Sequence, residues 1–296
     1  TQTRGQNSGN AMTKTLLTIG QGYSANALAG RLSPKGWKLF GTTRSPEKFP
    51  AIQALGVSPL LFPEGDLTEA LSEATHLLIS VSPSENGDPF LAKYGSKLHK
   101  HAPNLEWVGY LSTTGVYGDH AGGWVTEETP LTPSSRRGLM RVEAENQWRG
   151  TGLPLHIFRL SGIYGPHRGP FEKIRNGTAR RIIKEGQVFS RTHVDDIAQV
   201  LLASINSPNA GAAYNVCDDM PAPPQDVLAY AAELLGMAPP PEVRFEDAEL
   251  SPMARSFYGE SKRVANERIK NDLGVTLLYP DYKSGLQAVL AAETRK

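Results

Sequence analysis

A glycine-rich turn near the start of the chain has the spacing of a phosphate-binding site. Residues 20–25 have the pattern G-x-G-x-x-A and follow an apolar run, residues 15–19, that predicts a strand. Glycines there let the backbone approach a pyrophosphate, and the free N–H groups of the next helix favour its negative charge. We expect this turn to bind a dinucleotide rather than to be a plain β-α turn. Its residues are Gly20, Gln21, Gly22, Tyr23, Ser24 and Ala25.

The end of the second predicted strand indicates which dinucleotide is bound. An NAD-preferring protein carries Asp or Glu at this position to hold the ribose 2′-hydroxyl, whereas this chain has Thr43 and Arg44. A guanidinium donates two parallel hydrogen bonds to a phosphate. We therefore expect both residues to contact NADP(H), with NAD(H) as the alternative cofactor. The other interpretation of Arg44 is a solvated surface turn.

The elements that must position these residues alternate along the chain. Seven short apolar runs predict strands, and helical periodicity separates most of them, for example in residues 24–32 and 194–205. Repeated β-α units predict an α/β fold with a doubly wound parallel sheet. Ser80 and Val81 end the fourth strand and are expected beside the cofactor. The predicted strands are residues 15–19, 37–41, 58–62, 76–81, 107–112, 155–160 and 213–216.

Five further motifs resemble those of the extended short-chain dehydrogenase/reductases, in the NAD-dependent epimerase/dehydratase group. The resemblance covers nearly the whole chain from Met12. It implies a Rossmann domain and a smaller C-terminal α/β substrate lobe. It also implies a homodimer, because relatives commonly form homodimers. The motifs are LSTTGVYG (111–118), EETPLTP (127–133), FRLSGIYGP (158–166), HVDDIA (193–198), and SKR (261–263) followed by LG (273–274).

The resemblance also implies domain boundaries. The cofactor domain is expected to comprise residues 12–165 and 192–220, and the substrate lobe residues 166–191 and 221–296. Residues 1–11 are polar, and we interpret them as a tag remnant or disordered lead before Met12.

The family's catalytic residues are only partly present. A Ser or Thr on the fifth strand acts in this family with a Tyr-x-x-x-Lys on the next helix, and Thr113 stands at the first of these positions. The Tyr and Lys positions hold Arg137 and Arg141. Arginine stays protonated, so Arg137 cannot exchange a proton near pH 7 as a tuned tyrosine does. Ser112 and Arg141 are still expected at the cofactor.

The role of the two arginines has two interpretations. Arg141 and Glu145 are spaced for an i,i+4 ion pair on a solvated helix face. The alternative is that the arginines bind an anionic ligand, with Arg137 contacting the substrate. The family's dehydratases carry Asp-Glu where this chain has Thr114 and Gly115, so sugar dehydration by that route is not expected.

A basic segment follows the sixth strand. Residues 168–191 contain seven basic and two acidic residues, and by the resemblance they line the substrate cleft. We expect Tyr164, Arg168 and Arg191 to contact a small anionic or nucleotide-linked substrate. The alternative is an ordinary solvated helix. Other nearby candidates for catalysis are Tyr117, His120 and Tyr164, and for each of them we favour a structural role over a catalytic one.

Composition narrows the possible functions. A net charge of +1 does not indicate nucleic-acid binding, which usually requires an excess of positive charge. The positive charge of the basic segment is balanced by an acidic stretch, residues 225–260. No run of 18 apolar residues predicts a membrane span. Because Cys217 is the single cysteine, a disulfide framework and a Cys-based zinc cluster are excluded. A reducing, cytoplasmic compartment fits this composition, and we expect no metal site. Two functions remain: an oxidoreductase or epimerase, and a dinucleotide-binding sensor without catalysis.

Overall fold

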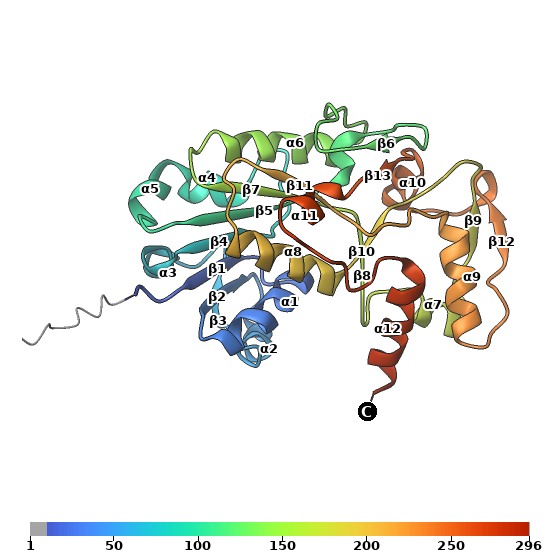
Figure 1. Cartoon of the computed structure of the whole chain (residues 1–296), viewed down its shortest axis with the longest axis horizontal. Helices are drawn as coiled ribbons and strands as arrows, with labels where there is room; N and C mark the ends of the chain where they lie inside the picture. The colour runs from blue at the N-terminus through green and yellow to red at the C-terminus, as the bar shows by residue number, and fades with distance from the viewer. Residues whose placement is uncertain (1–10, 296) are drawn as a thin grey trace, which may run out of the picture.

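The computed structural model describes residues 11–295, and a parallel sheet of seven strands lies at its centre (Figure 1). The strand order is β11-β7-β5-β4-β1-β2-β3. This order reverses between β1 and β4, where a crevice opens at the carboxyl ends of the strands. The predicted doubly wound parallel sheet is confirmed, with strand ends shifted by no more than two residues. The strands are β1 (Thr15–Ile19), β2 (Lys38–Thr43), β3 (Ser58–Leu61), β4 (His76–Ile79), β5 (Trp107–Thr113), β7 (Leu155–Leu160) and β11 (Ala213–Val216).

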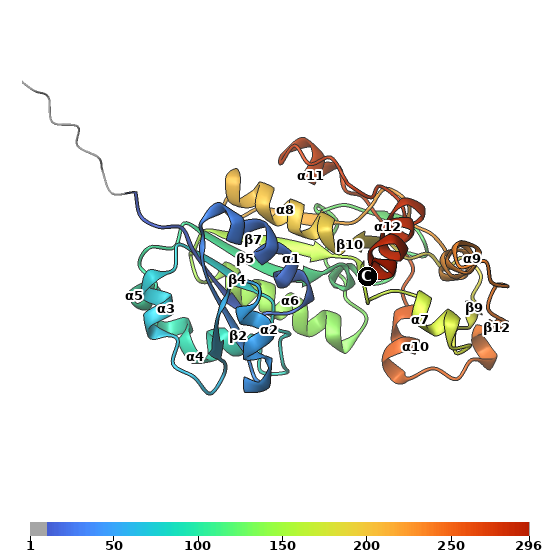
Figure 2. The same cartoon turned by 90° about the horizontal axis from the view of Figure 1, so that it is seen from below.

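Helices cover both faces of the sheet (Figure 2). On one face, Leu28 of α1 and Leu201 of α8 belong to the same apolar cluster as Trp107. On the other, Leu71 of α3 and Trp148 of α6 belong to a second apolar cluster. The central strands β1, β4 and β5 are buried on both faces, and they are mostly apolar. The helices are α1 (Tyr23–Leu32), α2 (Phe49–Gln53), α3 (Thr68–Glu73), α4 (Pro89–Tyr94), α5 (Leu98–His101), α6 (Arg136–Arg149) and α8 (Val194–Asn206).

A smaller lobe lies to the right in Figure 1 and has its own core. Tyr164, Phe171 and Leu286 belong to this core, and pairs of short parallel strands replace a larger sheet. Residues 168–191 form one short helix, one short strand and the first residue of another strand, not a single solvated helix. The elements of the lobe are β8 (Gly162–Tyr164), α7 (Phe171–Arg175), β9 (Arg181–Ile183), β10 (Arg191–His193), α9 (Pro224–Leu234), β12 (Glu242–Arg244), α10 (Pro252–Tyr258) and α12 (Tyr282–Thr294).

Residues 262–272 do not form one continuous helix. Strand β13 (Arg263–Val264) pairs there with β6 (Trp124–Val125), and helix α11 begins only at Glu267 (Glu267–Asn271). The Arg263 N–H donates to the Gly123 carbonyl at 2.9 Å. This long-range ladder outweighs local helix propensity.

Three other features bear on function. No helix in residues 11–295 combines the length and apolar character needed to cross a bilayer. Nor do these residues include a group of three or more His, Cys, Asp or Glu able to hold a metal ion. Cys217 is buried and burial raises the pKa of its thiol, so it does not supply a thiolate near pH 7. The predicted lead, residues 1–11, lies outside the described residues except for Ala11.

Candidate functional site

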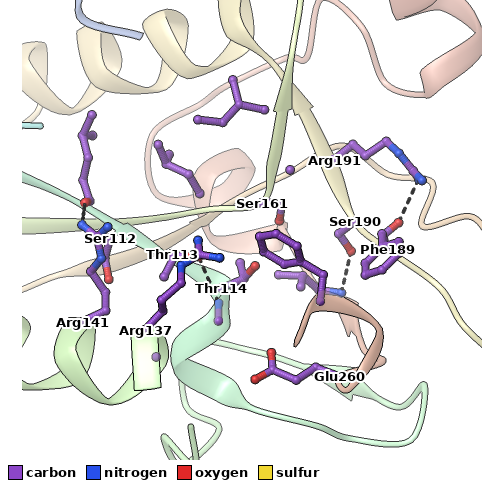
Figure 3. A pocket seen from close by; sticks show the side chains of 18 of the residues that line it. Ser112, Thr113, Thr114, Arg137, Arg141, Ser161, Phe189, Ser190, Arg191 and Glu260 are labelled. Carbon is purple, nitrogen blue, oxygen red and sulfur yellow. Dashed lines mark hydrogen bonds between the residues drawn. The ribbon is translucent and has the colours of Figure 1, made fainter. Parts of the chain in front are cut away.

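A cavity of about 850 Å³ lies between the carboxyl edge of the sheet and the lobe (Figure 3). The start of α1, the end of β5 and the first turns of α6 line it from the cofactor domain. Residues around β8, β10, α10 and β13 line it from the opposite side. Its charged lining comprises five cations and one carboxylate. These are Arg137, Arg141, Arg168, Arg191, Lys262 and Glu260.

The glycine-rich turn has the geometry that a pyrophosphate needs. Gly20 has φ +93°, and a Cβ there would lie 2.9 Å from Cγ1 of Val81. A Cβ at Gly22, in contrast, would meet no atom nearer than 4.0 Å. Gly22 is the N-cap of α1, whose first turn has neither a capping side chain nor an acid. The helix N–H groups are therefore free to receive an anion, and the turn fits a dinucleotide.

The other residues of the turn are partly structural. The Gln21 N–H donates to the Thr42 carbonyl at 2.8 Å, which fixes the turn against β2. Ala25 is buried in the core, whereas Tyr23 and Ser24 line the cavity.

The expected cofactor residues on β2 and β4 lie around this turn. Thr43 Oγ1 accepts a hydrogen bond from the Ser45 N–H at 3.2 Å. Arg44 is exposed at the end of β2, and neither it nor Thr43 lines the cavity. Ser80 lines the cavity and Val81 packs on Gly20. Of these four residues, Ser80 alone lines the cavity.

Thr113 is the candidate for polarising a substrate oxygen. Its Oγ1 accepts a hydrogen bond from the Gly115 N–H at 3.1 Å. Because this bond uses a lone pair, the hydroxyl proton remains free to be donated into the cavity. Thr113 ends β5 and shares the cavity with Gly22 and Ser24. A reacting oxygen and the cofactor turn therefore fit in one compartment.

The two arginines that replace the dyad differ in their contacts. Helix α6 begins after Ser135, whose Oγ accepts from the Gly138 N–H at 3.0 Å. The Arg137 guanidinium lies 4.8 Å from the ring centroid of Phe257 and forms no ion pair among the described residues. Arg141 donates to the Leu111 carbonyl at 2.9 Å, which ties α6 to β5. Of these two residues, Arg137 therefore has free hydrogen-bond donors, whereas Arg141 mainly holds α6 against β5.

The predicted ion pair between Arg141 and Glu145 is wrong. Glu145 lies on the buried side of α6 and is 1% exposed. It pairs instead with Arg159 of β7, at 2.9 Å between Oε2 and Nη2. Ser112 Oγ donates to the other carboxylate oxygen at 2.6 Å, so this expected cofactor residue has a partner inside the protein. A buried carboxylate requires such partners because desolvation is costly.

The alternative catalytic candidates have structural partners. The Tyr117 hydroxyl donates to Asn215 at 2.6 Å, and a ring nitrogen of His120 lies 2.9 Å from the Tyr117 carbonyl. Neither residue lines the cavity. Tyr164 does, but its hydroxyl packs against Gly285, where a Cβ would be only 1.7 Å away. Burial raises the pKa of the Tyr164 hydroxyl, which opposes its use as a base.

The basic segment contributes less to the cavity than its composition suggests. Of its seven cations, only Arg168 and Arg191 line the cavity. Arg191 donates to the carbonyls of Phe189 and Ala222, and Figure 3 shows its head group directed away from Thr113. Burial lowers the pKa of this guanidinium. Two backbone carbonyls therefore occupy Nη1 of Arg191, while its guanidinium adds positive charge to the lining of the cavity.

Several lining residues were not expected from the sequence. Lys262 Nζ donates to Glu260 at 3.0 Å, and both side chains are almost buried. The Ser161 hydroxyl is buried at the cavity without a hydrogen-bond partner among the described residues. The SKR motif includes Lys262, but the sequence does not predict β13, the strand that follows Lys262 and places it at the cavity.

Comparisons with known proteins agree with this architecture. No family model matches the chain. Protein YeeZ of Escherichia coli strain K12 is 29% identical over 283 residues, which are 90% of this chain and 97% of that protein. The structure of a functionally unknown conserved protein from Silicibacter pomeroyi is 58% identical, with a TM-score of 0.92 over 95% of this chain and 99% of that chain.

Two further structures share the fold and have descriptive names. One is a putative NAD-dependent epimerase/dehydratase from Methylobacillus flagellatus, 27% identical, with a TM-score of 0.68 over 96% of this chain and all of that chain (100%). The other is UDP-glucuronic acid 4-epimerase from Bacillus cereus in complex with NAD, 16% identical, with a TM-score of 0.75 over 95% and 100% of the two chains.

Proposed function

The chain belongs to the extended short-chain dehydrogenase/reductase family, in its NAD-dependent epimerase/dehydratase group, and we propose that it is an NADP(H)-dependent oxidoreductase or epimerase. The substrate is a small anionic or nucleotide-linked compound with an oxygen at the reacting carbon. One observation carries the proposal: the Thr113 hydroxyl, with a free proton, lies in the same cavity as the uncapped start of α1.

The cofactor would be held by the glycine-rich turn and the ends of β2 and β4. Gly22, Tyr23 and Ser24 would hold its pyrophosphate, Ser80 would contact it from the end of β4, and Arg44 would bind a ribose 2′-phosphate. The bound cofactor supplies or accepts a hydride. The guanidinium at the end of β2, with no acid at that position, supports NADP(H), whereas the NAD in the Bacillus cereus epimerase supports NAD(H) as the alternative.

The chain's own residues would orient and polarise the substrate. Thr113 would donate a hydrogen bond from its hydroxyl to the reacting oxygen and stabilise the charge that develops there. Arg137 holds an anionic group of the substrate, since its guanidinium lies at the cavity without a carboxylate partner among the described residues. Arg141 keeps α6 against β5 while lining the cofactor side of the cavity. Without the tyrosine, turnover is expected to be slower by about 10²–10⁴ than with a positioned acid.

A second candidate function is a dinucleotide-binding sensor. The arginines at both dyad positions favour it, because neither can exchange a proton near pH 7. A sensor retains cofactor affinity but shows no turnover.

Steady-state oxidation of NADPH, together with product analysis of nucleotide sugars for epimerisation, which consumes no NADPH overall, separates the two functions. The assay uses a panel of carbonyl acids, their amides and nucleotide sugars. We expect turnover with an anionic compound, a loss of about 10²-fold in kcat/KM in Thr113→Ala, and recovery in Thr113→Ser, which keeps the hydroxyl. Arg137→Gln should raise KM for the acid about tenfold and leave its amide unaffected. Tight cofactor binding without turnover for any compound would favour the sensor.

A further inference from the structure

A short turn of the lobe contacts the cofactor turn directly. It spans residues 165–168, between β8 and α7, and Gly165 and Arg168 exchange two backbone hydrogen bonds of 3.0 Å. His167 has φ +61°, a left-handed conformation that is unfavourable for a residue with a Cβ. The Glu293 carboxylate of α12 accepts from the His167 N–H at 2.8 Å. The surrounding structure thus holds the turn in a strained but defined shape.

Tyr23 fixes the same turn from the other side. Its hydroxyl donates to the Pro166 carbonyl at 2.7 Å. A Cβ at Gly165 would lie 2.5 Å from this hydroxyl, so the approach requires glycine at that position. Tyr23 is the first residue of α1 and follows the N-cap glycine of the phosphate-binding turn. Two segments separated by more than 140 residues therefore form one surface at the start of α1.

Arg168 is the positively charged residue of the 165–168 turn, and it lies beside Tyr23 at the cavity. Its guanidinium lies 5.4 Å from the centroid of the Tyr23 ring, and it lines the cavity together with Gly22 and Ser24. The side chain is exposed, and among residues 11–295 the ion pairs of its segment are formed by Arg175 and Arg181, not by Arg168. Burial raises the pKa of Tyr23 to about 12, so the phenol remains neutral and does not form an ion pair with the guanidinium.

We propose that Arg168 is a cofactor residue, which binds the pyrophosphate of the dinucleotide from the lobe side. The proposal rests on the proposed cofactor site and changes the assignment of Arg168, which the sequence places at the substrate. The pyrophosphate lies between the N–H groups at the start of α1 and the guanidinium, whose planar donors match phosphate oxygens. Strain at His167 is consistent with this role, because a preformed donor loses less entropy on binding.

Calorimetric titration of three ligands tests the assignment: NADPH, ADP-ribose, which contains the pyrophosphate, and adenosine 2′-monophosphate, which lacks it. Arg168→Gln should raise the Kd of NADPH and of ADP-ribose at least tenfold, as for the loss of a charge-assisted hydrogen bond. The Kd of adenosine 2′-monophosphate should not change. Lys173→Gln, which removes an exposed cation of the same segment outside the cavity, should bind all three ligands as the wild type does.

Two controls make the result decisive. Arg168→Lys keeps the charge and should recover part of the affinity for ADP-ribose. Equal Kd values of Arg168→Gln and the wild type for ADP-ribose would overturn the proposal and leave the proposed function intact. A wild-type protein that binds neither NADPH nor ADP-ribose would overturn both.

Discussion

Arg159 of β7 and Glu145 of α6 form a bidentate ion pair behind the cavity, with N–O distances of 2.9 and 3.1 Å. The remaining partners complete a buried network, since Ser112 donates to Glu145 and Arg159 donates to the Tyr117 hydroxyl at 3.0 Å. Tyr117 in turn donates to Asn215 of β11. The pair therefore connects α6 to three neighbouring strands and holds the end of β5, which carries Thr113.

Breaking this pair should destabilise the fold strongly. Arg159→Met leaves a buried carboxylate without its counter-charge, and we expect a loss of about 3–5 kcal/mol in the free energy of unfolding, measured by urea denaturation. The double variant Arg159→Met/Glu145→Leu removes both charges and should be clearly more stable than the single variant. A single-variant loss below about 1 kcal/mol would contradict this account of the pair.

Asp218 should make stability depend on pH. Its side chain is 3% exposed and Oδ2 has no hydrogen-bond partner among the described residues. Burial raises the pKa of this carboxyl to about 7, against the partial compensation of the nearby Arg191. The folded state then binds more protons than the unfolded state between about pH 4 and 7, so stability falls as pH rises through that window.

Asp218→Asn removes this titration. We expect the variant and the wild type to have similar Tm values near pH 4.5, and the variant to be more stable at pH 8 by about 1–3 kcal/mol, which corresponds to about 2–4 °C for each kcal/mol. Differential scanning calorimetry across pH measures the difference. Asp272→Asn, at an exposed position, serves as the control. If the Tm difference between Asp218→Asn and the wild type did not change with pH, Asp218 would be excluded as the source of the pH-dependent stability.

Arg44 should determine the preference between the two nicotinamide dinucleotides. Arg44→Ala removes the proposed contact to the 2′-phosphate, so the Kd of NADPH should rise about 10- to 100-fold while that of NADH stays constant. Lys48→Ala, an exposed cation four residues further along, should change neither value. Equal affinity of the wild type for NADPH and NADH would refute the role of Arg44.

The sequence predicts the cofactor half of the molecule better than the lobe. Each buried strand of the sheet is an apolar run that ends near a turn, and Gly20, Gly22 and Thr113 occupy the ends of such runs. Their placement follows from local pattern and from the rule that parallel strands end at one edge.

The lobe depends on contacts between distant segments, which local pattern does not encode. Lys262 reaches the cavity because β13 pairs with β6, about 140 residues earlier in the chain. Glu145 has the spacing of a surface ion pair with Arg141, but the face of α6 on which it lies is buried against β7 and β5. Burial, rather than spacing, decides which partner a carboxylate takes.

The central claim is that the turn at Gly22 binds a dinucleotide, and fluorescence titration with NADPH tests it most directly in Gly22→Asp. The fold accepts this change, because a Cβ at Gly22 has no neighbour nearer than 4.0 Å and φ is −118°. An aspartate there even caps α1, so Tm should hold or rise, while its charge repels the pyrophosphate. Gly22→Asn, of equal size but neutral, separates charge from bulk. We predict tight NADPH binding by the wild type, weakened binding by Gly22→Asn and none by Gly22→Asp. NADPH binding by Gly22→Asp equal to that of the wild type would contradict the account.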